Sequence, residues 1–483
     1  MSKIQTIGLV AGPVAFFILQ QIDFLGLPPA AQGVLSSTAW VAIWWITEAL
    51  PMQVTAFLPI VLFPLTGGLD IKTTTTTYFS PIIVLFLGAF IIAIAIEKWN
   101  LHIRIALNII RFIGTKSNFI VLGFMVATAF LSMWISNTAT TLMMLPIGLA
   151  ITRTMEKFQD TASQNLAFNR SLMLAIAYGA SIGGMATLIG TPTNAVFSAI
   201  SLELYGQEIS FFRWFLIGLP ISAVLIIIGW QYLTGIIFKS VEIDAGKAKE
   251  ATDKQLKALG AMSYEEKAVA IIFFLTAVAW ITRSFILSKF IPNIDDTIIA
   301  ITSALVLFLM PARGKGKMLM DWESAKKLPW GVLILFGGGL AIAVGFGDSG
   351  LAAWLGERLS ALEVLPYALI LLVLILLVNF FTEITSNVAT AAVLLPILGS
   401  LALSLGVHPY GLMAGASIAA SCAFMLPVAT PPNAIIYSSG YLDMKVMMRV
   451  GFVMNLISVV VVFLIIYFLM PVIWGIDLMK YPF

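Results

Sequence analysis

Long, uninterrupted runs of apolar residues follow one another along this chain, and they constrain the fold more than any other feature. Of the 483 residues, 60% are hydrophobic and only 11% are charged, whereas about 25% of the residues of a soluble domain are charged. A bilayer admits only helices and closed barrels, because every backbone polar group must be paired inside the protein. The runs are continuous and do not alternate with polar residues, so they predict an all-α integral membrane protein rather than a barrel.

The same composition excludes several functions. A soluble enzyme, a nucleic-acid-binding protein and a disordered chain do not have this apolar content. The single cysteine rules out a disulfide framework, and the two histidines, His102 and His408, lie too far apart in sequence to suggest a metal site. The glycine-rich segment 336–350 follows no predicted strand, so we expect no nucleotide site there. No nucleophile–base pair suggests an intramembrane enzyme.

Eleven segments are apolar and long enough to approach the roughly 20 residues that a membrane span needs. Two further apolar stretches, 117–152 and 364–404, are each interrupted by a polar Ser-Asn motif, and we interpret them as re-entrant hairpins. Asp23 and two prolines follow the first apolar run in place of a signal-cleavage site, so that run is interpreted as a span. The expected spans are 7–27, 33–50, 52–68, 81–97, 171–200, 211–238, 266–288, 296–311, 329–356, 410–439 and 447–473.

Basic residues divide unevenly when the N-terminus is placed in the cytoplasm. Of the 27 Lys and Arg residues, 21 then fall on the cytoplasmic side, and cytoplasmic loops are known to be enriched in them. This distribution requires 117–152 to enter and leave from the cytoplasmic side and 364–404 to do so from the other side. We therefore predict a multi-pass protein of the cell (inner) membrane, with a cytoplasmic N-terminus and an external C-terminus.

The two halves of the chain contain matching segments. Residues 86–95 resemble 336–345, and the Ser-Asn motifs recur at the same spacing of 250 residues. A Thr-Pro-x-Asn motif also recurs, at a spacing of 239 residues. The paired motifs are Ser136-Asn137-Thr138 with Ser386-Asn387-Val388, and Thr191-Pro192-Thr193-Asn194 with Thr430-Pro431-Pro432-Asn433. Two halves that enter the membrane from opposite sides form an inverted repeat, which is typical of secondary transporters.

The paired motifs lie inside apolar runs and interrupt them. Unpaired polar groups in hydrocarbon cost several kcal/mol, so such a break is tolerated where it lines a cavity or binds a ligand. The hydroxyl and amide oxygens suit a hard cation, and the helix N-termini that follow each Ser-Asn motif suit an anion. Each proline removes an amide donor and forces the helix to unwind. The carbonyls freed in this way are potential cation ligands.

Charged residues are scarce where the motifs lie. Lys and Arg are absent from 117–152, 171–212 and 359–444, so helix dipoles and bound cations would have to balance an anionic substrate. Two carboxylates, Glu48 and Glu383, fall inside apolar segments, where acids are expensive and often functional. Glu383 precedes Ser386 by three residues, so it is expected either to support the hairpin tip or to relay protons. Glu48 is expected to be a structural hydrogen-bond partner or a proton relay.

These motifs, together with the segment Ile46-Thr47-Glu48-Ala49-Leu50-Pro51, resemble the divalent-anion/sodium symporter family, the sodium-coupled dicarboxylate and citrate transporters. The resemblance covers essentially the whole chain. It implies a homodimer in which each protomer has a scaffold domain and a transport domain that moves like an elevator. It also implies two or more Na⁺ sites. The first would be formed by Ser132, Ser136, Asn137 and the backbone near Gly190, and the second by Thr382, Thr385, Asn387 and the backbone near Ala429.

The same resemblance implies a substrate site between the two hairpin tips. One position departs from the family pattern, because Val388 stands where a threonine is often found, and this removes a hydroxyl from the pocket. The residues expected to bind the substrate are Asn137, Thr138, Thr191, Ser386, Asn387, Val388 and Thr430.

The sequence as a whole predicts a secondary transporter that imports C4-dicarboxylates such as succinate, malate and fumarate with Na⁺. The alternatives are a sodium-independent dicarboxylate or citrate exchanger and, in a different class, an anion channel. The expected organisation is scaffold helices in 1–116, transport elements in 117–238, a cytoplasmic linker in 239–267, scaffold helices in 268–360 and transport elements in 361–483.

Overall fold

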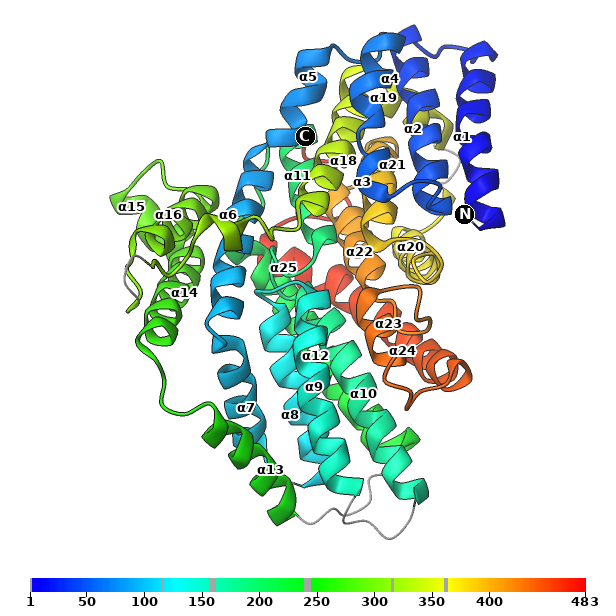
Figure 1. Ribbon diagram of the computed structural model, residues 1–483. Helices are drawn as coiled ribbons and strands as arrows, with labels where there is room; N and C mark the ends of the chain where they lie inside the picture. The colour runs from blue at the N-terminus through cyan, green and yellow to red at the C-terminus, as the bar shows by residue number, and fades with distance from the viewer. Residues whose placement is uncertain (1, 115, 157–161, 239–244, 314–316, 360–363) are drawn as a thin grey trace.

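The computed structural model describes the chain except for residues 1, 115, 157–161, 239–244, 314–316 and 360–363 (Figure 1). Within the described residues, all the regular elements are helical. Seven of these described helices are long and apolar enough to cross a membrane, judged by length and composition. The predicted class of an all-α integral membrane protein is therefore confirmed.

The helices of the first half run from α1 to α12. They are α1 (Lys3–Gln21), α2 (Pro29–Thr47), α3 (Met52–Thr55), α4 (Leu58–Thr66), α5 (Ile71–Thr76), α6 (Pro81–Lys98), α7 (Leu101–Ile113), α8 (Ser117–Ser132), α9 (Asn137–Glu156), α10 (Ala162–Met185), α11 (Pro192–Tyr205) and α12 (Phe211–Gln231). A 3₁₀ turn, η1 (Thr77–Phe79), precedes α6, and a π-turn, η2 (Tyr232–Ile237), extends α12.

The helices of the second half run from α13 to α25. They are α13 (Ala245–Ala258), α14 (Tyr264–Thr282), α15 (Ser288–Phe290), α16 (Asp296–Leu309), α17 (Trp322–Ala325), α18 (Trp330–Asp348), α19 (Leu351–Leu359), α20 (Tyr367–Phe381), α21 (Asn387–Ser404), α22 (Pro409–Ser421), α23 (Pro431–Tyr437), α24 (Met444–Leu464) and α25 (Met470–Trp474). Two π-turns, η3 (Arg283–Leu287) and η5 (Ile465–Leu469), follow α14 and α24.

The internal repeat is visible in where the helices begin. Helices α7, α8 and α9 start 250 residues before α19, α20 and α21, and α11 starts 239 residues before α23. Even an unusual backbone angle recurs, since Asn100 before α7 and Gly350 before α19 have φ angles of 56° and 82°. Helix α7 packs on α13, whereas its counterpart α19 packs on α21 and α2, and Figure 1 shows the two helices toward opposite ends of the molecule.

Besides the two spans that contain a Thr-Pro-x-Asn motif, two further expected spans are each divided into two helices. The segment 329–356 forms α18 and α19, because the chain turns at Gly350 in the left-handed region that favours glycine. The segment 52–68 forms α3 and α4, and Pro59 follows the first residue of α4, where its missing amide costs no helical hydrogen bond. Of the expected linker 239–267, residues 239–244 lie outside the described residues, and the rest holds α13 and the start of α14.

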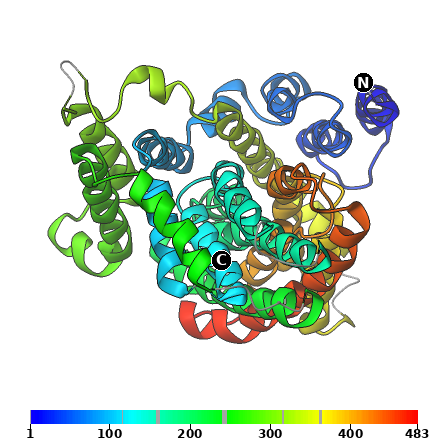
Figure 2. The same ribbon diagram turned by 60° about the horizontal axis from the view of Figure 1, so that its bottom comes forward.

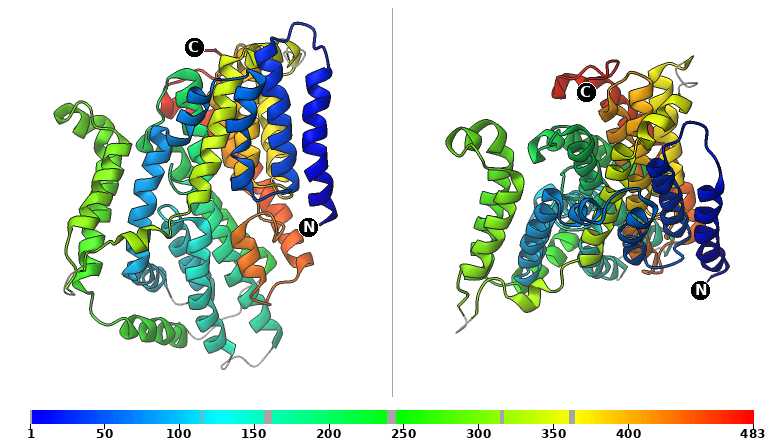
Figure 3. Two further views of the ribbon diagram at one scale, coloured as in Figure 1. Left: turned by 45° about the horizontal axis from the view of Figure 1, so that its top comes forward. Right: turned by 90° about the horizontal axis from the view of Figure 1, so that it is seen from above.

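The two hairpins pack against the broken helices of both halves. Helix α8 lies along α10, and α20 lies along α22, so each hairpin contacts the broken helix of its own half. The second arms also contact the other half, because α9 packs on α23 as well as α10, and α21 packs on α11 as well as α22. Helices α14 to α16 stand to one side and contact this group mainly through α6 and α12 (Figures 2 and 3). This packing between the halves brings the four helix breaks into one region.

Candidate ligand-binding site at the helix breaks

The first Ser-Asn motif forms the turn between α8 and α9. Ser132 ends α8, and its buried hydroxyl donates a hydrogen bond of 2.6 Å to Oδ1 of Asn137, which begins α9. The Oγ of Ser136 accepts from the amide of Ala139 at 3.3 Å, so Ser136 caps the N-terminus of α9. The turn therefore gathers a hydroxyl, an amide oxygen and a helix N-terminus at one point.

The second Ser-Asn motif repeats this arrangement. The hydroxyl of Thr382 donates to Oδ1 of Asn387 at 2.8 Å, and Ser386 is the N-cap of α21. Thr382 also lies 3.0 Å from the carbonyl oxygen of Ala420. Each member of the Thr382–Asn387 pair lies 250 residues after its counterpart in the Ser132–Asn137 pair. The hydroxyl of Thr385 instead pairs with that of Thr390 at 2.8 Å.

The first broken helix is unwound between α10 and α11. Helix α10 ends at Met185, Pro192 begins α11, and Thr191 is its N-cap. Gly184 lies so close to the hairpin tip that a Cβ atom on it would stand 2.4 Å from Oδ1 of Asn137 and 3.1 Å from the carbonyl oxygen of Gly190. The structure thus brings Ser132, Asn137 and Gly190 together, as the sequence predicts for these three residues.

The second broken helix is unwound between α22 and α23, and a buried acid forms hydrogen bonds with the unwound segment. The carboxylate of Glu383 is 3% exposed and accepts hydrogen bonds of 2.8–3.0 Å from the amides of 424–426. The side chain of Asn455 donates to the same carboxylate at 2.8 Å. Glu383 therefore supports the unwound segment rather than the hairpin tip beside it. Thr430 is the N-cap of α23, and Ala429 precedes it; none of the described hydrogen bonds joins Ala429 to Asn387.

The two breaks meet each other through the end of α22. Thr193, in the first turn of α11, lies with its hydroxyl 2.7 Å from that of Ser421, the last residue of α22. The hydroxyl of Thr191 lies 3.5 Å from the same Ser421 oxygen. Thr191, an expected site residue of the first half, therefore lies beside the start of the second break.

The expected substrate residues at the two hairpin tips are less buried than their surroundings, whereas Thr191 and Thr430 at the broken helices are buried. Asn137, Thr138, Asn387 and Val388 are all partly exposed, whereas Ser132 and Thr382 behind them are fully buried. The hydroxyl of Thr138 makes no hydrogen bond with the residues that the structure describes. Val388, its counterpart, is partly buried at the edge of the hydrophobic core. Two hairpin tips thus present polar groups that remain available to a ligand.

The model of the sodium:sulfate symporter transmembrane family matches residues 5–476 of the chain. The chain belongs to this family. Among its similar relatives are proteins named sodium-dependent dicarboxylate transporter SdcS, from Staphylococcus saprophyticus and from Staphylococcus aureus strain MRSA252. Each is 47% identical to this chain, over 98% of the chain and 93% of the relative. The resemblance to the divalent-anion/sodium symporters is confirmed, and a symporter family of membrane transporters is not a family of enzymes.

Two solved structures share the fold at low identity. The Alcanivorax borkumensis YdaH transporter aligns with a TM-score of 0.59 and 12% identity, over 91% of this chain and 98% of that chain. The MtrF protein of Neisseria gonorrhoeae aligns with a TM-score of 0.55 and 12% identity, over 93% of this chain and 96% of that chain. Both agree with the all-α architecture of a membrane transporter.

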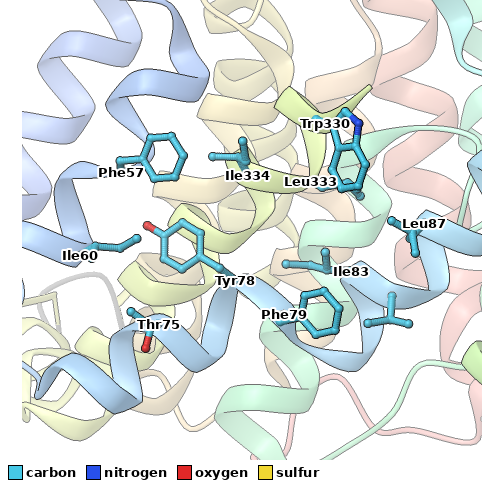
Figure 4. A pocket seen from close by; sticks show the side chains of 11 residues that line it. Phe57, Ile60, Thr75, Tyr78, Phe79, Ile83, Leu87, Trp330, Leu333 and Ile334 are labelled. Carbon is cyan, nitrogen blue, oxygen red and sulfur yellow. The ribbon is translucent and has the colours of Figure 1, made fainter. Parts of the chain in front are cut away.

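Two cavities lie away from the breaks. The first, of about 270 Å³, is almost entirely apolar and is lined by residues of α4, α6 and α18 together with Tyr78 and Phe79 (Figure 4). The second, of about 780 Å³, is polar and includes Lys72, Glu203 and Asp348. Neither cavity is lined by any of the site residues expected from the sequence.

Sequence reasoning missed several residues around the breaks and placed one acid in the wrong setting. Asn455 is a lone asparagine in the apolar helix α24, and that isolation could have marked it. Asn194 and Asn433 end the two Thr-Pro-x-Asn motifs, where their recurrence was the available signal. Glu48 is the C-cap of α2, with a φ of 47° and an exposed side chain, and no hydrogen bond among the described residues joins it to the breaks.

Proposed function

We propose that this member of the family is a secondary transporter that imports C4-dicarboxylates together with Na⁺. The observation that carries the proposal is the pair of matching tips, Ser132–Asn137 and Thr382–Asn387, each placed beside an unwound helix. The names of the relatives from Staphylococcus support dicarboxylate as the substrate class and Na⁺ as the coupling ion.

The oxygens at the first tip are suited to Na⁺. Ser132, Asn137 and Gly190 offer a hydroxyl, an amide oxygen and a backbone carbonyl. All three are neutral, hard ligands, and hard cations such as Na⁺ prefer oxygen ligands. The hydroxyl of Ser132 donates to Asn137, so its own oxygen lone pairs stay free for a cation. In this proposal Ser136 joins the first site, while Thr382, Thr385, Asn387 and the backbone near Ala429 form the second. The chemistry of these residues fits two sodium ions.

The substrate carboxylates are proposed to lie between the tips, against the N-termini of α9 and α21. The amide of Asn137 and the hydroxyl of Thr138 would bind one carboxylate, and Ser386, Asn387 and Val388 would face the other, with Thr191 and Thr430 beside them. No Lys or Arg occurs in 117–152 or 359–444 to neutralise a dianion. Helix dipoles and bound Na⁺ would supply the positive charge, which explains why transport would depend on the cation.

The movement would be that of an elevator. In this proposal the hairpins and broken helices of 117–238 and 361–483 form a transport domain. The helices of 1–116 and 268–360 form the scaffold of a homodimer in the cell membrane, and the N-terminus is cytoplasmic. The packing of α7 and α19 supports this division, because each connects a scaffold segment to a hairpin helix: α7 packs on α8, and α19 packs on α21.

Uptake of labelled succinate into proteoliposomes tests the function. We expect saturable uptake that an inward Na⁺ gradient drives and that an equal K⁺ gradient does not. Uptake that needs internal dicarboxylate and ignores Na⁺ would identify an exchanger instead. Flux that rises linearly with succinate and shows no counterflow would identify an anion channel.

A further inference from the structure

Two asparagines outside the proposed ligand contacts hold equivalent places at the helix breaks. Asn194 lies in the first turn of α11 and Asn433 in the first turn of α23, at the last position of each Thr-Pro-x-Asn motif. Both side chains are fully buried. Each amide lies directly after the unwound segment of its half.

Asn194 reaches back across the first break to the end of α10. Its Nδ2 lies 3.4, 3.3 and 2.8 Å from the carbonyl oxygens of Gly184, Met185 and Thr187. The last carbonyls of a helix have no partner within the helix, so this side chain supplies a donor there, and Trp214 Nε1 supplies a second one to the Met185 carbonyl at 3.0 Å. The Gly184 carbonyl is also the one that crowds Gly190, because a Cβ on Gly190 would stand 2.5 Å from it. Asn194 thus fixes the backbone that forms one wall of the first proposed sodium site.

Asn433 does the same in the second half. Its Nδ2 donates to the carbonyl oxygens of Ala423 at 3.2 Å and Leu426 at 3.0 Å. These carbonyls belong to the unwound segment that leads to Ala429 and Thr430. The two asparagines therefore make equivalent contacts in the two repeats, each joining the start of the second half-helix to the residues that follow the first.

In both amides the NH₂ group makes hydrogen bonds with the described residues and the oxygen makes none. Oδ1 of Asn194 and Oδ1 of Asn433 are buried without a hydrogen-bond partner. Burying an unpaired acceptor costs about 1–3 kcal/mol. The side chain is therefore kept for its NH₂ group, which can reach several carbonyls at once, as neither a leucine nor an aspartate can.

We propose that Asn194 and Asn433 are positioning residues that set the sodium affinity of the first and second sites without touching the ion or the substrate. The inference rests on the proposed function. Without the amide, the freed carbonyls of the break rotate toward other partners, and the oxygen cage loses its shape before the cation arrives. Succinate bound between the tips is affected only through Na⁺, so its KM at saturating Na⁺ is retained.

The two breaks differ in the hydrogen bonds that remain after the asparagine is replaced. In the second break Glu383 still holds the amides of 424–426 when Asn433 is replaced. In the first break no acid plays that part among the described residues. Loss of Asn194 therefore weakens sodium binding more than loss of Asn433.

The experiment compares Asn194→Ala and Asn433→Ala with Thr276→Ala, a control on the scaffold side whose buried hydroxyl bonds to Ser303. Sodium titrations of succinate uptake in proteoliposomes give the half-saturating Na⁺ concentration, and succinate titrations at saturating Na⁺ give KM. We expect the sodium value to rise roughly tenfold for Asn194→Ala and about threefold for Asn433→Ala, where tenfold corresponds to about 1.4 kcal/mol. We expect KM within about twofold of the wild type for both, and no change in the control.

Asn194→Leu and Asn433→Leu keep the branched shape of the side chain but remove its donor without burying a charge. The readout for them is the rise in melting temperature that Na⁺ alone causes in the purified protein, which needs no transport. We expect that rise to shrink, most of all for Asn194→Leu. A fall in maximal uptake with unchanged sodium dependence, or a raised KM at saturating Na⁺, would overturn the inference. A wild-type protein whose uptake ignores Na⁺ would instead contradict the proposed function.

Discussion

The two helix breaks are built on the same plan but are held in different ways. In the first repeat the hydroxyl of Thr187 donates to the backbone oxygen of Met133, at the hairpin turn. In the second repeat the position equivalent to Met133 is Glu383, whose carboxylate binds the unwound segment through its amides. One break thus depends on neutral groups and the other on a buried charge. The repeat explains the symmetry of the oxygens, and the acid is the reason that we expect the two proposed sites to differ in their affinity for Na⁺.

The largest expected effect comes from the residues that both repeats share. Asn137→Ala and Asn387→Ala each remove an amide that can give its oxygen to a cation and its NH₂ to a carboxylate. A lost buried hydrogen bond costs about 1–3 kcal/mol, so uptake at low succinate should fall by roughly tenfold or more. The measurement is initial uptake in proteoliposomes with equal amounts of folded protein. Near wild-type uptake in a well-folded Asn137→Ala protein would refute the role of that tip.

The next largest effect tests the difference between the repeats. Glu383→Gln keeps one acceptor oxygen and replaces the other with an NH₂ group. This NH₂ group would face a backbone N–H of residues 424–426, and an N–H is a donor that cannot accept a hydrogen bond. Because hydrogen bonds to charged groups contribute about 1.5–3 kcal/mol, we expect a lowered melting temperature and a weaker response to Na⁺. Met133→Leu is the matched control, since Met133 acts through its backbone. Equal losses in the two variants would remove the proposed asymmetry.

A smaller effect is expected at Val388, the position at which the triplets 136–138 and 386–388 differ. Val388→Thr restores the hydroxyl that Thr138 carries in the first tip, with little change of shape. The gain of a hydrogen bond to a carboxylate is partly offset by desolvation, so we expect the half-saturating succinate concentration to fall by roughly threefold to tenfold. Succinate titrations measure the gain in affinity, and a thermal melt measures the cost of the new hydroxyl in stability. Unchanged or weaker affinity together with a lower melting temperature would place residue 388 in the packing and outside the site.

The smallest effect is expected at Glu48. Its side chain is exposed at the end of α2 and has no hydrogen bond to the breaks within the described part of the chain. Exposed substitutions usually change stability by less than about 0.5 kcal/mol, so Glu48→Gln should leave uptake and its pH dependence as in the wild type. Loss of uptake with normal folding would restore this acid as a participant in transport.

Much of the architecture could be predicted because it depends on local signals. The Ser-Asn and Thr-Pro-x-Asn motifs interrupt apolar helices by themselves, and the spacing of 250 residues gives α8 with α20 and α9 with α21 directly. The division of 329–356 into α18 and α19 was not predicted, although Asp348-Ser349-Gly350 interrupts the apolar run. The polar Asn100, which ends the equivalent span in the first half, was a second available signal.

The contacts of the site could be predicted less well because they join distant parts of the chain. Glu383 is three residues from Ser386, which suggested the tip, but its partners lie in 424–426 and at Asn455. Apolar periodicity carries no information about which buried acid meets which unwound backbone. The same holds for Asn194, whose partners are clear only when α10 and α11 are placed end to end.

The dependence of succinate uptake on Na⁺ concentration tests the central claim most directly. Two sodium sites built by two breaks predict uptake that is zero without Na⁺ and rises sigmoidally with it, with a Hill coefficient above one, whose upper limit is the number of sites. Replacing Na⁺ by K⁺ at every concentration should abolish uptake in the same proteoliposomes. Saturable succinate uptake of equal rate in Na⁺ and K⁺ would contradict the account.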